Sequence, residues 1–195
     1  MPVSTGNIKV GAVPNVSLMP CSTCRQDVPC AKRGNCYALK SLMYPNVRRA
    51  WGDNTAMAQN DRDGYFTMVA DYLKRKSPRL FRWHVSGDIP PENSQDYLER
   101  MKTVAREFPD TRFLVFTKRF GLDFRNRPAN LSVVFSMWPG MPVPRRKAGI
   151  RRAWVQDGTE TRVPADAIEC SGNCESCGMC WQLDSIGRDV WFAKH

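Results

Sequence analysis

The sequence has no long apolar run and no recognisable secretory leader. Because no stretch of 18 or more residues is apolar, we expect no membrane-spanning helix and no membrane partner. Residues 1–7 show neither the basic start nor the apolar segment of a signal peptide, so we expect the protein in the cytoplasm. Thiols stay reduced there, and cysteines in such proteins are more often metal ligands than disulfides.

Common catalytic signatures are missing as well. The chain carries no glycine-rich loop of the P-loop or dinucleotide-binding type, and its carboxylates form no paired motif. Histidine is scarce, with two residues in the whole chain. The chemistry-bearing residues that stand out are instead the eight cysteines.

Four of the cysteines lie within eleven residues near the C-terminus, at positions 170, 174, 177 and 180. Zinc sites usually place a long spacer between two short cysteine pairs, and this run has none. Such compact runs are typical of iron–sulfur ligation. We therefore predict a 4Fe–4S cluster held by Cys170, Cys174, Cys177 and Cys180, with zinc as the alternative, and disulfides or free thiols as a third possibility.

The other four cysteines, Cys21, Cys24, Cys30 and Cys36, lie near the N-terminus with wider gaps. All four could hold a second cluster. Alternatively, Cys24, Cys30 and Cys36 hold it through three irons and leave one iron open for chemistry, with Cys21 spare. A third alternative is one centre that takes ligands from both groups. Two clusters are the preferred prediction.

Apolar patterns predict an α/β fold with continuously apolar, parallel strands. It is expected as a partial parallel (β/α) barrel or an open sheet of four to six strands, in a single domain, with metal-binding cysteine loops at both ends of the chain. Residues 37–40 suggest a short helix broken by Pro45. The other expected elements are helices at 62–76 and about 97–108, strands at 80–88, 112–118, 131–136 and 151–156, and a final strand or packed tail at 190–192. The predicted segments are a cysteine loop at 17–40, an α/β core at 62–156 and a cysteine cluster segment at 165–182.

Polar residues follow the predicted strands, where parallel α/β folds place their functional edge. His84 could transfer protons or ligate, or could be a satisfied core histidine. Asp88 could bind a cation or an amino group, or cap a helix. Lys118 could bind an anionic substrate, or lie on the surface. These three are the catalytic candidates, and the candidates for cofactor binding are Tyr37, Ser86, Gly87, Asp88 and Ser136.

Several motifs resemble the phage "gene product 88" family. They are Cys-Tyr-Ala-Leu-Lys at 36–40, His-Val-Ser-Gly-Asp at 84–88, Phe-Thr-Lys at 116–118 and the final cysteine run ending in Trp181. The resemblance covers about residues 17–182. It implies a phage-encoded protein, which would act in the host cytoplasm.

More distantly, the layout is similar to radical SAM enzymes. That resemblance implies a cluster loop after the first strand of a partial barrel, with Ser86, Gly87 and Asp88 where those enzymes hold the amino group of S-adenosylmethionine. The chain departs from their pattern in its cysteine intervals, which are five and five residues instead of three and two. Its aromatic residue, Tyr37, also follows the last cysteine of the loop instead of preceding it.

The formal charge of +10 suggests an anionic partner such as nucleic acid. Two functional hypotheses result. The first is a redox or radical-type iron–sulfur enzyme with a reactive N-terminal cluster, an auxiliary C-terminal cluster, and an electron donor or small-molecule substrate as partner. The second is a non-catalytic module, stapled by zinc or a structural cluster, that binds nucleic acid through basic loops.

Overall fold

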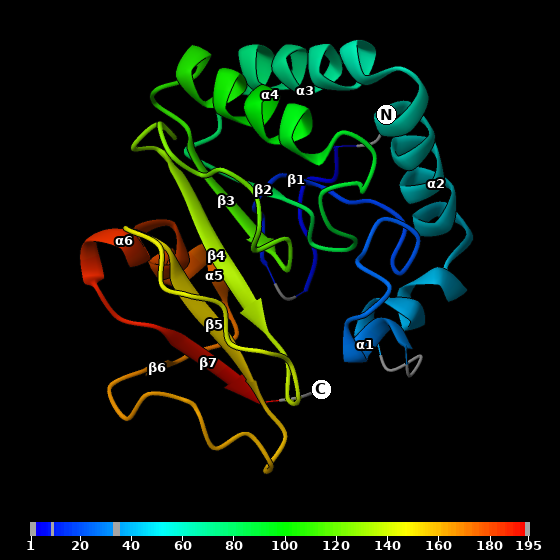
Figure 1. Ribbon diagram of the computed structural model, residues 1–195. Helices are drawn as coiled ribbons and strands as arrows, with labels where there is room; N and C mark the ends of the chain where they lie inside the picture. The colour runs from blue at the N-terminus through cyan, green and yellow to red at the C-terminus, as the bar shows by residue number, and fades with distance from the viewer. Residues whose placement is uncertain (1–2, 9, 33–35, 194–195) are drawn as a thin grey trace.

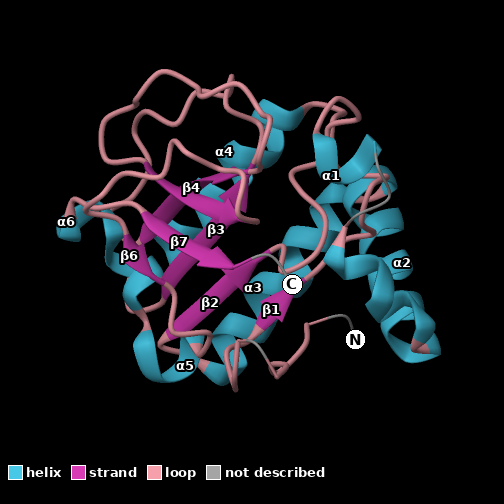
Figure 2. Ribbon diagram, turned by 90° about the horizontal axis from the view of Figure 1, so that it is seen from below, coloured by secondary structure: helices cyan, strands magenta, loops and turns pink. Residues whose placement is uncertain are grey.

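A computed structural model describes residues 3–8, 10–32 and 36–193. Its centre is one sheet of seven strands, all paired in parallel, in the order β1-β2-β3-β4-β5-β7-β6. The strands are β1 (Asn15–Val16), β2 (Leu80–Trp83), β3 (Arg112–Thr117), β4 (Leu131–Met137), β5 (Arg151–Gln156), β6 (Ile168–Glu169) and β7 (Val190–Ala193). Figure 2 shows the strands side by side, with β1 and β6 at the edges.

The prediction of an α/β fold with a parallel sheet is confirmed, and the sheet is open. The sheet has one strand more than the upper limit of the predicted four to six, and its two edge strands, β1 and β6, are only two residues long. Such short segments carry no periodic signal in a sequence. The predicted strand at 80–88 ends early, at Trp83. It ends there because His84 adopts a left-handed backbone conformation, with φ of 52°, which no extended strand accommodates.

Two helices, α3 (Arg62–Lys76) and α4 (Ser94–Glu107), cover one face of the sheet. A third, α2 (Pro45–Asn60), lies beside the segment that follows β1, where Asn54 and Thr55 bond to the backbone of residues 17 and 19. Figure 1 shows α3 and α4 together on the same side of the strands. The predicted helices at 62–76 and 97–108 are thus confirmed. α3 begins where the Asp61 carboxylate accepts from the Gly64 backbone N–H at 3.0 Å, and it ends in three basic residues that suit the negative end of the helix dipole.

Pro45 does not break a helix, as the sequence had suggested, but begins one. The short 3-10 helix η1 (Tyr37–Met43) ends just before it, and Pro45 occupies the first turn of α2. A proline at this position loses no hydrogen bond, since the first backbone N–H groups of a helix have no partner inside it. The sixteen residues of α2 were therefore missed.

The opposite face of the sheet is covered by the C-terminal segment, which contains the short helices α5 (Cys174–Cys177), η2 (Met179–Gln182) and α6 (Leu183–Ile186). The remaining short helix, α1 (Pro29–Lys32), belongs to the N-terminal cysteine segment. This segment joins β6 to β7, where the strand order reverses. Because crossover connections are right-handed, reversing the direction moves the connection to the other face. The C-terminal cysteines are thereby packed on the face that the long helices leave open.

Within the described part of the chain, no helix is long and apolar enough to span a membrane. Gly34, which helped to predict a loop between Cys30 and Cys36, lies outside the described residues.

Candidate metal centres: two cysteine sites

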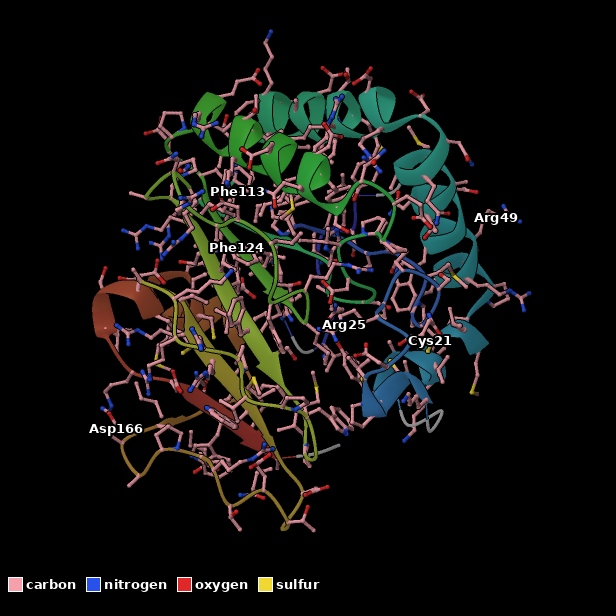
Figure 3. The ribbon with its side chains drawn as sticks, viewed as in Figure 1. Cys21, Arg25, Arg49, Phe113, Phe124 and Asp166 are labelled. Atoms are coloured by element: carbon pink, nitrogen blue, oxygen red, sulfur yellow. The ribbon has the colours of Figure 1, made fainter. Side chains whose placement is uncertain are left out.

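The four N-terminal cysteines come together in the segment that follows β1. Cys30 is buried on α1, and Cys36 immediately precedes η1. The Cys21 thiol hydrogen-bonds with that of Cys36 and lies within electrostatic range of Cys30. Cys24 is likewise close to Cys36. Cys21 lies beside α1 in Figure 3. The structure therefore places Cys21 with the other three and gives this N-terminal site four thiols.

Thr23 attaches the N-terminal site to the turn after β2. Its hydroxyl donates to the carbonyl of Met19 at 3.0 Å and accepts from the backbone N–H of Asp88 at 3.2 Å. Gly87 has φ of 79°, and a Cβ there would lie 2.7 Å from the Thr23 hydroxyl and 2.8 Å from Cβ of Leu18. Only glycine fits so close an approach. The predicted cofactor-binding residue Gly87 thus has a structural reason to be glycine.

Asp88 is buried, and both of its carboxylate oxygens are engaged. Oδ1 accepts from the Thr117 hydroxyl at 2.7 Å and from the Ile89 backbone N–H at 2.8 Å, while Oδ2 accepts from the Lys118 backbone N–H at 2.8 Å. The carboxylate therefore ties the end of β2 to the end of β3. Its observed contacts are structural, and they hold Lys118 in place beside the cysteines.

Lys118 supplies the positive charge of the N-terminal site. Its ammonium donates to the Ser136 hydroxyl at 2.9 Å and lies within electrostatic range of the Cys24 and Cys30 thiols. Within the described residues, it forms no ion pair with a carboxylate. Two residues predicted from separate strands, Lys118 and Ser136, are thus brought together at one thiol site.

His84 does not join this group. Its ring lies against Tyr97 of α4, with Nε2 3.0 Å from the Tyr97 hydroxyl, whereas Nδ1 is buried without a partner. Ser86 is also buried, and its hydroxyl has no partner among the described residues. Ser136 lies on the other face of the sheet. Its neighbours in β4, Phe135 and Met137, pack towards the helices, so the Ser136 side chain points the opposite way. The predicted edge is therefore divided between two faces.

His84 should make the protein sensitive to acid. Burial lowers the pKa of His84 to about 3, while an unfolded histidine titrates near 6.5. The unfolded chain therefore binds one more proton between these values, so stability is full above pH 6.5 and falls as the pH drops towards 3. The expected slope is about 1.4 kcal/mol per pH unit.

The variant His84→Asn removes this titration and keeps a residue type that tolerates a left-handed backbone. Urea unfolding of both proteins at pH 4, 5, 6 and 7 is expected to show a shallower loss of stability in the variant. Equal slopes for the two proteins would contradict the assignment.

The four C-terminal cysteines form a second group. Cys180 lies within electrostatic range of Cys170, Cys174 and Cys177. The local backbone is compact, because Gly178 has φ of 58° and its N–H donates to the carbonyl of Cys174 at 2.9 Å. The site is also anchored to the last strand, since the Cys170 N–H donates to the carbonyl of Trp191 at 2.8 Å.

Arg82 supplies the positive charge of this C-terminal site. It comes from the face of β2 that the long helices leave open, and its guanidinium hydrogen-bonds with the Cys174 thiol and acts on Cys180. The Phe116 ring covers it, with 4.7 Å from Cζ to the ring centroid. Nε is buried without a partner, and no described carboxylate forms an ion pair with Arg82. Sequence reasoning missed this residue, although alternation along β2 places it opposite Trp83.

Trp181 packs the C-terminal site onto the sheet. It is 5% exposed, and its indole N–H donates to the carbonyl of Phe81 at 3.0 Å. Its own carbonyl accepts from the Ser132 hydroxyl at 2.9 Å. On the outer side, the Glu175 carboxylate accepts from the Ala12 N–H at 2.8 Å, so the N-terminal segment lies over the cysteine run.

Burial favours the neutral form of some thiols in each site. Burial raises the pKa of Cys24 and of Cys180 to about 12, and it also raises the pKa of Cys30 and of Cys174. Metal binding would therefore release protons, because the ligand is the thiolate. Among the described residues, no three His, Cys, Asp or Glu side chains lie where they could hold a single metal ion.

A cavity of about 240 Å³ lies next to the N-terminal site. Val28 and Met141, which line it, pack against Cys30. Arg25 and Asp27, paired with each other, stand among the lining residues. The volume of the cavity is below the roughly 300–1,000 Å³ that is usual for small-molecule sites.

The basic residues are spread over several elements. Arg48 and Arg49 are exposed on α2, whereas Lys147 donates to the carbonyl of Leu122 and Arg152 to that of Pro144. Internal contacts thus use part of the positive charge that suggested a nucleic-acid partner.

Comparison with known proteins gives one match. A family model described as "Gene product 88" matches residues 4–183. A search of curated proteins and a search of solved structures each found no match. Nothing in these comparisons extends to the radical SAM enzymes. The matched range includes both cysteine sites and every strand of the sheet except β7. The chain therefore belongs to the phage gene product 88 family.

Proposed function

We propose that this protein is an iron–sulfur redox protein with two separate 4Fe–4S clusters, one at each cysteine site. The observation that carries the proposal is the pairing of each four-thiol group with one cation that has no carboxylate partner in the described structure: Lys118 at the N-terminal site and Arg82 at the C-terminal site.

Charge balance explains why such cations support a cluster. Four thiolates around a doubly positive core carry a net charge of roughly −2. A half-buried cation without a counter-charge is costly, and an anionic centre beside it removes that cost. A set of four thiolates can hold such a cluster, because each thiolate binds a different iron.

The N-terminal site is the better candidate for the reactive centre. It lies at the carboxyl ends of β2 and β3, next to Lys118, Ser136 and the cavity. Because Cys21 joins its group, we assign four thiolates to it and do not extend the proposal to S-adenosylmethionine. The C-terminal site, packed between the sheet and the N-terminal segment, would serve as the supporting electron relay.

Iron and sulfide analysis of anaerobically isolated protein tests the proposal. We expect about eight iron atoms per chain, and about four after either Cys36→Ser or Cys177→Ser, because each change disables one independent site. Ser176→Ala is the control, since it alters the C-terminal run without removing a thiol.

Colourless protein with stoichiometric zinc and no sulfide would overturn the proposal. If that protein also bound DNA or RNA with a steep salt dependence, the metal-stapled nucleic-acid-binding module would replace it.

A further inference from the structure

Tyr37 and Arg82 link the two cysteine sites. Tyr37 directly follows Cys36, and its hydroxyl donates to the backbone carbonyl of Val85, just beyond β2. Arg82 lies in β2 itself, three residues earlier, with its guanidinium beside Cys174. The Arg82 charge also acts on the Tyr37 hydroxyl. The Tyr37 hydrogen bond thus ties the N-terminal site to the segment that directly follows the strand carrying Arg82.

Water screens these contacts poorly. The Tyr37 side chain is 42% exposed, but its hydroxyl turns inward to Val85. Val85 and Phe116 belong to the same apolar cluster as Cys174, and the Phe116 ring lies over Arg82. Charges in such surroundings interact far more strongly than charges on the surface.

This inference rests on the proposed function. We propose that Arg82 is a shared counter-charge of both sites, and that its charge acts on the N-terminal site through Tyr37. Each site gains negative charge when it takes up an electron. Arg82 stabilises that added charge at both sites, more strongly at the C-terminal site, which it contacts directly. The coupling is reciprocal, because it is a difference in free energy between states of the two sites.

The variant Arg82→Gln removes the charge and keeps a polar side chain on β2. In a titration with dithionite as the electron source, followed by electron spin resonance, both midpoint potentials are expected to fall. At the C-terminal site we expect a change of about tenfold in the reduction equilibrium, which is 59 mV for one electron. A smaller fall is expected at the N-terminal site. Cys36→Ser and Cys177→Ser identify which signal belongs to which site.

Two control variants separate charge from folding. Arg82→Lys keeps the charge and is expected to restore most of both potentials. Arg151, on β5, is another half-buried arginine whose Nε lacks a hydrogen-bond partner. Arg151→Gln is expected to shift neither midpoint potential. In a Tyr37→Phe background, Arg82→Gln is expected to shift the N-terminal potential by less than it does in the wild-type background.

The possible failures are distinguishable. A fall at the C-terminal site alone would overturn the shared counter-charge and leave the proposed function standing, as would equal shifts in Arg151→Gln. Wild-type protein without iron and sulfide would overturn the proposed function, and this inference with it, before any variant is made.

Discussion

Replacing Asp88 with alanine is expected to lower the free energy of unfolding by about 4 kcal/mol. If the proposed cluster is present, the change should also remove iron from the N-terminal site. The change leaves the Thr117 hydroxyl and the backbone N–H groups of Ile89 and Lys118 without their acceptor. Each unsatisfied buried donor costs about 1–3 kcal/mol. Lys118 would also lose the bond that fixes its backbone beside the cysteines, whereas Thr23 would keep its bond to the backbone N–H of residue 88.

Urea unfolding and iron content per chain measure the two effects. Asp88→Asn keeps one carbonyl acceptor and is expected to lose about half as much stability. The matched control is Asp110→Ala, at an exposed aspartate, which should stay within about 0.5 kcal/mol of wild type. Full iron content and wild-type stability in Asp88→Ala would show that the carboxylate does not hold the site together.

Trp181→Ala is expected to cost about 3–5 kcal/mol of stability, as is usual for removing a buried tryptophan. If the proposed cluster is present, the change should also reduce the iron bound at the C-terminal site. The indole fills the face of the sheet beneath the cysteine run, beside Leu114 and Val134. Without it, Cys180 would lose the packing that fixes its backbone against the sheet.

Trp181→Phe tests packing separately from hydrogen bonding. It retains an aromatic ring but loses the bond to the Phe81 carbonyl, for which about 1 kcal/mol is expected. Iron in the Phe variant should stay close to the wild-type amount. If Trp181→Ala retained the C-terminal iron at the wild-type level, the indole would have no part in shaping that site.

Buried helices and long strands were predictable because their apolar residues repeat regularly. In α4, Tyr97, Leu98 and Met101 are all fully buried, as their spacing had indicated. β3 and β4 are mostly apolar and mostly buried, and they lie in the middle of the sheet. The four N-terminal cysteines lie near one another, and so do the four C-terminal cysteines.

Other features depend on contacts that no local pattern encodes. The position of β7 between β5 and β6 follows from long-range pairing, and with it the face on which Cys174 lies. Arg82 looked like an ordinary strand residue, because its importance arises only when the C-terminal segment folds back over β2. His84 and Lys118 both follow strands, yet the left-handed backbone at His84 turns its ring towards α4.

The insertion of β7 sets an order for assembly during synthesis. The elements that surround the N-terminal site, up to β4, are complete once residue 137 has been made. The C-terminal site needs Trp191, because the Cys170 backbone bonds to it. In a growing chain the N-terminal cysteines can thus come together early, whereas the C-terminal group must wait until the final strand enters the sheet.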